Sequence, residues 1–193
     1  SQGQRGGGAG GVGQQQHRRS DAGALQGWLE AVLRHGAGWS DAVLLAQAAQ
    51  GADAAMLSEL GLALSPSAER RLETEQQGRA FAATVSEVWG REIPAAPYPV
   101  AVGLAVQALE LPLEEALRLY LQAFAANLAG AGVRLIPLGQ TDGQRVVQAL
   151  APLCAELAGR ALEAELDDLG GFAPLIDIAS QRHDMLYSRL FRS

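Results

Sequence analysis

The chain has 193 residues, of which 48 % are hydrophobic and only 5 % are aromatic, and its net charge is −6. This length is sufficient for one domain with a substantial core, and a core poor in aromatic residues has to be built from alanine, leucine and valine, which favours helices. The acidic balance lacks the basic footprint of a general nucleic-acid-binding protein, and no apolar run reaches membrane-spanning length.

The N-terminal segment, residues 1–19, is rich in glycine and glutamine and carries almost no apolar side chains. Such a segment buries too little surface to offset the entropy of ordering it, so we predict that it is flexible. Gly8, Gly10 and Gly13 match the GxGxxG pattern, but no strand precedes them, as dinucleotide binding requires. The segment also lacks the hydrophobic core of a signal peptide, and we therefore expect a cytoplasmic protein.

From Ser20 onward, apolar residues recur at the three- and four-residue spacing of helices. Serine and aspartate mark the helix starts, and glycine marks most of the helix ends. The predicted helices run from Ser20 to Gly36, from Ser40 to Gly51, from about Asp53 to Leu60, and from Ser65-Pro66 to just before Gly90. In the fourth helix, the apolar residues expected to face the core are Leu72, Phe81, Val85 and Val88.

Three prolines between Ile93 and Pro99 predict a connector without regular structure. A helix follows from about Val100 to Glu110, and Pro112 begins the clearest helix of the chain. An unbroken apolar stripe on this helix has to face a core, and it consists of Leu113, Leu117, Tyr120, Leu121, Phe124 and Leu128.

A polar loop is predicted from Leu135 to Gln144, with Thr141 or Asp142 capping the next helix. That helix ends near Gly170, and a last helical stretch begins near Pro174. No segment shows the alternating period of a strand. The sequence therefore predicts an all-α, single-domain bundle of about seven to nine helices.

Residues arranged for catalysis or metal binding are not found in the sequence, so we expect neither an enzyme nor a directly bound cofactor. Cys154 is the only cysteine, which excludes an intrachain disulfide and a cysteine metal cluster. The acidic pairs Glu114-Glu115 and Asp167-Asp168 fit solvated helix faces. The i, i+4 spacing of a helical metal site is missing among the three histidines, His17, His35 and His183.

The C-terminal stretch from Asp177 to Ser193, DIASQRHDMLYSRLFRS, is unusual for a chain end. It combines three arginines with aromatic and aliphatic residues, a composition typical of interface hot spots. A final helix that packs on its own core would have the same composition. Composition alone therefore leaves partner docking and core packing equally open.

The same stretch resembles the C-terminal signature of the UreF family of urease accessory proteins. The segments LIPLGQTDGQR, from Leu135 to Arg145, and LDDLGGFAP, from Leu166 to Pro174, resemble the family in order and spacing. The resemblance covers residues 20–193. Residues 4–19 do not continue the helix start that the family shows near its N-terminus, so the contribution of that element in this chain is open.

The resemblance implies an all-helical, usually dimeric protein without catalytic activity of its own. Proteins of this family act as chaperones that bridge UreD, also called UreH, and the GTPase UreG, and the assembly delivers nickel to apo-urease. The implied partners are therefore UreD/UreH, UreG, apo-urease and a second copy of the chain. Nickel is implied to be handled by the assembled complex, and no nucleic acid or membrane partner is expected.

The implied organisation is a flexible segment (1–19), a UreF-like helical domain (20–176) and a docking segment of the same domain (177–193). Docking on UreD/UreH is implied for Arg182, His183, Tyr187, Ser188, Arg189, Leu190 and Phe191. A second patch, implied to shape the dimer or the surface offered to UreG, consists of Arg134, Gln140, Asp142, Gln144 and Arg145. Simple helix capping also explains the polar residues of this second patch.

The implied mechanism is scaffolding with control of a partner's nucleotide cycle. A protein that binds one state of UreG better than the other shifts the equilibrium without doing chemistry. An arginine supplied in trans would be an enzyme-like variant, with Arg134 and Arg145 as the candidates. The alternative hypothesis is a generic all-helical protein–protein adaptor with a different partner.

Overall fold

The computed structural model of the chain describes residues 9–136 and 138–172, with side chains for residues 19–136 and 138–169. Every regular element in these ranges is a helix, which confirms the all-α class. The elements are α1 (Ala9–His35), α2 (Ala37–Ala49), α3 (Ala54–Leu64), α4 (Ala68–Trp89), α5 (Tyr98–Ala108), α6 (Leu113–Leu135), α7 (Gln140–Leu162) and the 3-10 helix η1 (Leu166–Phe172). None of the helices in this part of the chain is long and apolar enough to cross a membrane.

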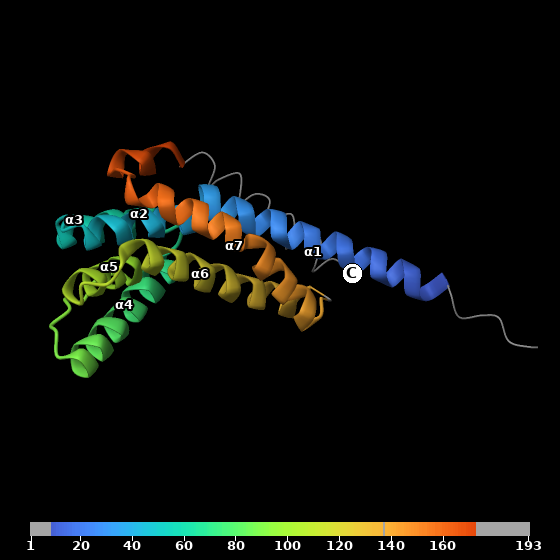
Figure 1. Cartoon of the computed structure of the whole chain (residues 1–193), viewed down its shortest axis with the longest axis horizontal. Coiled ribbons are helices and arrows are strands. Elements are labelled where there is room, and N and C mark those ends of the chain that lie inside the picture. The colour runs from blue at the N-terminus through green and yellow to red at the C-terminus, as the bar shows by residue number, and fades with distance from the viewer. Residues whose placement is uncertain (1–8, 137, 173–193) are drawn as a thin grey trace, which may run out of the picture.

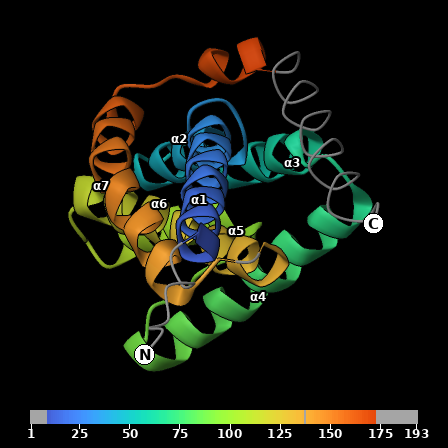
Figure 2. The ribbon, with the colours of Figure 1, turned by 90° about the vertical axis from the view of Figure 1, so that its right-hand side faces the viewer.

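Helix α2 lies at the centre of the fold. It contacts α1, α3, α5, α6, α7 and η1, while α1, α6 and α7 run beside one another along the length of the molecule (Figure 1). Viewed along α1, the helices α7 and α6 lie on one side of it (Figure 2), and α1 also contacts α2. The core is built mainly from aliphatic side chains, and its completely buried leucines are Leu29, Leu33, Leu45, Leu57, Leu117, Leu121 and Leu157.

Several helix ends lie where the capping signals predict them. Asp53 is the N-cap of α3, and its carboxylate accepts a hydrogen bond from the backbone N–H of Met56 at 2.7 Å. Gly90 ends α4 in the left-handed conformation (φ 64°) that favours glycine. Pro112 directly precedes the first residue of α6. These predictions are confirmed because each depends on chemistry within a few residues of the helix end.

The serines that were predicted to cap α2 and α4 do not cap these helices. Ser40 lies inside α2, where its hydroxyl donates to the carbonyl oxygen of Gly36 at 3.4 Å. In α4 the N-cap is Ser67 rather than Ser65, because the Ser67 hydroxyl accepts a hydrogen bond from the backbone N–H of Arg70 at 3.2 Å. The helix begins after the serine that satisfies a free N–H group of the first turn.

Helix α1 begins at Ala9, so the predicted helix start at Ser20 is wrong. Residues 9–19, which were predicted to be flexible, belong to this helix, whereas residues 1–8 lie outside the described ranges. Extending an existing helix is much easier than nucleating one, and glutamine and arginine are good helix formers. In Figure 1 the N-terminal end of α1 extends beyond α6 and α7.

Helix α4 buries only the middle of its predicted apolar stripe. Val85 is buried and Phe81 is partly buried, but the side chains of Leu72 and Val88 are 55 % and 63 % exposed. The helix packs mainly on α5 and projects away from the other helices (Figure 1). The prediction that Leu72 and Val88 face the core is therefore wrong, because the ends of α4 extend past the helix that covers its centre.

Helix α5 crosses α2 at Gly103, where the two backbones nearly touch. A Cβ atom at this position would overlap the carbonyl oxygen of Leu45 and lie 2.7 Å from the Cβ atom of Ala48. Gly78 of α4 approaches the carbonyl oxygen of Ala96 in a similar way. Gly103 therefore allows backbone contact between α5 and α2, and Gly78 allows it between α4 and the connector that leads into α5.

We expect Gly103→Ala to lower the free energy of unfolding by about 1–3 kcal/mol, because the added methyl group has to displace the backbone of α2. Gly159→Ala in α7 is the matched control. No atom lies within 4 Å of a Cβ at Gly159, so this variant should gain about 0.5–1 kcal/mol from helix propensity alone. Urea denaturation followed by circular dichroism measures both values, and equal effects of the two substitutions would contradict the close approach.

Candidate partner-binding surfaces

The predicted docking segment lies outside the described residues, together with all of its candidate contacts: Arg182, His183, Tyr187, Ser188, Arg189, Leu190 and Phe191. Their contribution to partner binding therefore stays a prediction. The described chain ends at Phe172 in η1, an element that contacts α2. Figure 1 places η1 at the end of the molecule opposite to the α6–α7 connection.

The second predicted patch lies at the corner where α6 meets α7, which we call the α6–α7 corner. The predicted loop from Leu135 to Gln144 is wrong, because α6 continues to Leu135 and α7 begins at Gln140. The N-cap of α7 is Gly139, so neither Thr141 nor Asp142 caps it. The patch consists of Arg134 in the last turn of α6 and of Gln140, Asp142, Gln144 and Arg145 in the first two turns of α7.

Close packing holds the α6–α7 corner together. Gly143 lies directly against α6, since a Cβ atom there would come within 2.6 Å of Cγ2 of Val133. The Asp142 carboxylate accepts a hydrogen bond from Arg145 at 3.1 Å, and the Arg145 side chain remains 73 % exposed. Arg134 is also exposed. The corner therefore presents two arginines to solvent from a closely packed pair of helices.

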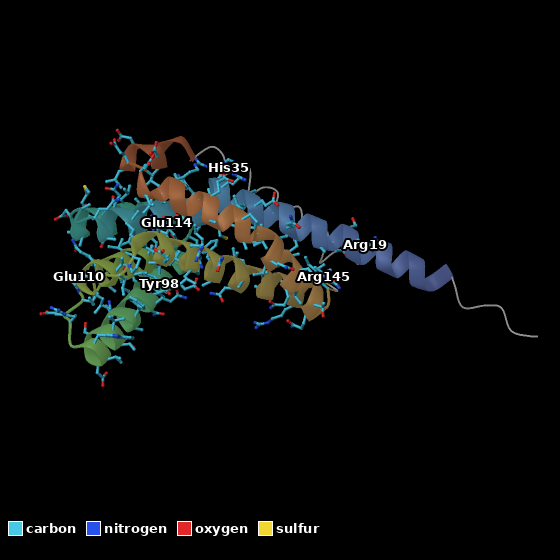
Figure 3. All side chains as sticks on the ribbon, in the orientation of Figure 1. Arg19, His35, Tyr98, Glu110, Glu114 and Arg145 are labelled. Atoms are coloured by element: carbon cyan, nitrogen blue, oxygen red, sulfur yellow. The ribbon has the colours of Figure 1, made fainter. Side chains whose placement is uncertain are left out.

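A hollow of about 700 Å³ lies between the first turns of α7 and helix α1. Its walls include Asp142 and Arg145 from α7 and Arg19 and Gln26 from α1. Figure 3 shows Arg19 and Arg145 at this end of the molecule. Arg19 was not predicted as part of the patch, because it was assigned to the flexible segment. Its i, i+7 spacing to Gln26 is the sequence signal that places both residues on one helix face.

An ion-pair cluster connects α1 to α7 farther along the bundle. Arg34 donates two hydrogen bonds to the Glu156 carboxylate, at 2.8 and 3.2 Å, and these bonds lower the pKa of Glu156 and raise that of Arg34. Arg160 lies 3.8 Å from Glu156, and its guanidinium group stands 4.8 Å from the ring centre of Trp39 in α2. The cluster orients α7 relative to both neighbouring helices.

An acidic side chain connects α2 to α6 near the centre of the molecule. The Asp41 carboxylate accepts a hydrogen bond from the Tyr120 hydroxyl at 2.8 Å. Burial raises the pKa of Asp41 to about 6, although the Tyr120 hydrogen bond and the charge of Arg70 act in the opposite direction. Burial and the neighbouring Asp41 raise the pKa of Tyr120 well above its usual value. The sequence identified Tyr120 as an apolar-stripe residue and did not identify Asp41.

The single cysteine lies in the core, as its place on the apolar stripe of α7 indicates. Cys154 is 1 % exposed, and burial raises the pKa of its thiol to about 11. Across residues 9–136 and 138–172, no three histidine, cysteine, aspartate or glutamate side chains come together as a metal site requires.

Comparison with known proteins places these surfaces in a family context. The family model UreF matches residues 19–151, which include the α6–α7 corner and Asp41. The chain is 50 % identical over 173 residues to the urease accessory protein UreF of Cereibacter sphaeroides (strain ATCC 17029 / ATH 2.4.9), covering 90 % of this chain and 82 % of the relative. It is 47 % identical over 175 residues to the protein of that name from Roseobacter denitrificans, covering 90 % and 79 % of the two chains.

The raised pKa of Asp41 predicts how stability changes with pH. The carboxyl group of an aspartate in an unfolded chain has a pKa of about 3.9, so the folded chain binds the Asp41 proton more tightly than the unfolded chain does. The free energy of unfolding therefore falls as the pH rises between about 4 and 6. We expect Asp41→Asn to be more stable than the parent chain by about 1–3 kcal/mol at pH 7 and similar to it near pH 4.

Urea denaturation across this pH range measures the effect, with Asp167→Asn at an exposed position as the control. The control should follow the parent chain at every pH. The same pH slope in the parent chain and in Asp41→Asn would show that Asp41 is not the titrating group.

Proposed function

Because the chain belongs to the UreF family of urease accessory proteins, we propose that it links UreD/UreH to the GTPase UreG while nickel is inserted into apo-urease. In this proposal the chain is a cytoplasmic adaptor without a reaction of its own, and the assembled complex holds the nickel. Its family membership supports the proposal most directly. The structural observation that favours an adaptor is the α6–α7 corner, which presents Arg134 and Arg145 to solvent.

The length of α7 suits an adaptor. The α6–α7 corner lies at the first turn of α7, and η1, where the described chain ends, follows the last turn. A helix of 23 residues spans about 35 Å at 1.5 Å per residue. A partner bound at the α6–α7 corner would therefore leave the η1 end of α7 accessible to a second protein.

We assign the α6–α7 corner to UreG. Exposed arginines suit this contact because their planar groups form bidentate hydrogen bonds with carboxylates and phosphates. If the corner has a higher affinity for one nucleotide state of UreG, binding shifts UreG toward that state. A homodimer, which the family resemblance implies, belongs to the same proposal.

Removal of Tyr187 to Ser193 should abolish co-purification with UreD/UreH. Hot-spot residues of this type each contribute enough for about a tenfold or larger loss of affinity. The control is full-length chain with Arg134→Gln and Arg145→Gln, which should retain UreD/UreH. Undiminished binding by the shortened chain would contradict the assignment of the docking segment.

The same double variant, Arg134→Gln with Arg145→Gln, should weaken UreG binding by about tenfold or more. A variant with Arg71→Gln and Arg79→Gln removes two exposed arginines from α4 and should bind UreG normally. Unaltered affinity of the corner variant would overturn the assignment. Normal binding with slower GTP hydrolysis would instead indicate an arginine that acts on the nucleotide.

The alternative is a generic adaptor with another partner. We distinguish the two hypotheses by testing whether urease activation requires this chain. Reconstitution of apo-urease with nickel, UreD/UreH and UreG should yield active enzyme only when the chain is added. Activation at the same level without it would favour the alternative.

A further inference from the structure

Two hollows meet at Asp41 beneath the first turns of α4. One, of about 260 Å³, lies between α1, α2, α3 and α4 and has an apolar wall that includes Trp28, Val32, Leu44 and Leu64. The other, of about 320 Å³, lies between α4 and α6. Asp41, Arg70 and Thr74 line both hollows. We call the two hollows together the Asp41 cleft.

The carboxylate in this cleft has a hydrogen bond, but no cationic side chain of the described residues forms an ion pair with it. Its Oδ2 atom accepts the Tyr120 hydroxyl at 2.8 Å, and among the described residues no donor is bonded to Oδ1. Arg70 and Glu73, the other charged residues that line the cleft, pair with each other at 2.7 Å. The raised pKa of Asp41 reflects this poorly compensated burial.

Aromatic rings line the second hollow beside the Asp41 carboxylate. Tyr98 and Tyr120 lie with their ring centres 5.7 Å apart at an angle of 32°, and Phe81 packs edge-on against Tyr98. Figure 3 shows Tyr98 where α5 and α6 lie beside α4. Aromatic ring faces attract cations, so a carboxylate beside two tyrosine rings is suited to a cation with an apolar stem.

The size of the cleft limits the ligand. Pockets for drug-sized molecules and cofactors hold about 300–1,000 Å³, and each of these hollows is at or below the lower end of that range. A single long side chain fits this space. Arginine combines a stem that can lie on the apolar wall with a planar group that pairs with a carboxylate and stacks on an aromatic ring.

We propose that the Asp41 cleft binds an arginine side chain presented by a partner protein. The source of the arginine rests on the proposed adaptor function, whereas the cation specificity rests on the residues of the cleft. Arginine side chains buried in such pockets are frequent anchors of protein interfaces. The cleft would thus supply a contact surface with a different lining from that of the hollow at the α6–α7 corner.

A titration of the full-length chain with n-butylguanidinium tests the cation specificity without any partner protein. The indole N–H signal of Trp28, which lines the apolar wall, reports binding by NMR. We expect a saturable shift with n-butylguanidinium and an affinity about tenfold or more weaker for the neutral n-butylurea. Asp41→Asn should reduce the guanidinium affinity by a similar factor, while Glu75→Gln, an exposed α4 acid outside the cleft, should not change it.

Three outcomes would overturn the proposal: no saturable shift, equal affinity for the two probes, or unchanged affinity in Asp41→Asn with an intact circular dichroism spectrum. Replacement of Arg182, Arg189 and Arg192 by glutamine in the full-length chain tests an internal occupant. If the probe binds only to that variant, an arginine of the chain itself fills the cleft, and the partner assignment is wrong. Because UreD/UreH and UreG are absent, these outcomes are independent of the proposed function.

Discussion

The backbone contact between α2 and α5 determines how the central helix is enclosed. The absence of a side chain at Gly103 lets α5 lie on the backbone of α2, and the other helices close around them. Two glutamines near the C-terminal end of α2, the partly buried Gln47 and the exposed C-cap residue Gln50, connect it to the end of α7. Gln47 donates to the carbonyl oxygen of Ala164 at 2.8 Å, and Gln50 donates to that of Leu162 at 2.9 Å. These contacts satisfy carbonyl groups at the end of α7 that no further helical turn can reach.

Helix α2 thus connects the Asp41 cleft to the C-terminal end of α7. On one side it carries Asp41, at the meeting point of the two hollows, and on another it holds the end of α7 through its glutamines. The ion-pair cluster of Arg34, Glu156 and Arg160 holds the middle of α7 against α1. At the far end, Gly143 brings α7 into contact with α6. Helix α7 is therefore fixed at both ends and between them.

The sequence predicted the all-α class and those helix ends that depend on local chemistry, such as Asp53 and Gly90. The sequence-based predictions were wrong where a tertiary contact determines the local structure or the burial of a residue. The α6–α7 connection contains glycines and polar residues, which suggested a long loop, but Gly143 is a packing residue against Val133 and lies within a helix. Leu72 was expected in the core, yet it is exposed because α5 begins beneath Thr74 and does not cover the part of α4 before it.

Some residues of the candidate sites could be identified from the sequence, and others only from the structure. The arginines of the α6–α7 corner were identified from a family motif, and the structure changed their setting from a loop to two helix ends. Asp41 gave no signal, because an aspartate in the second turn of a helix is ordinarily a solvated residue. Its environment is created by Tyr120, 79 positions away in the sequence. Only the packing of α2 against α6 brings these two residues together.

The burial of Cys154 has a practical consequence for studies of the assembly. A thiol that is enclosed in the core and protonated at neutral pH reacts poorly with maleimides and other thiolate-directed reagents. The native chain should therefore react very little with such reagents during site-specific labelling. A cysteine introduced at an exposed position of α7 or α4 can carry a fluorophore or spin label without removal of the natural one, so distances within the complex become measurable on an otherwise unaltered core.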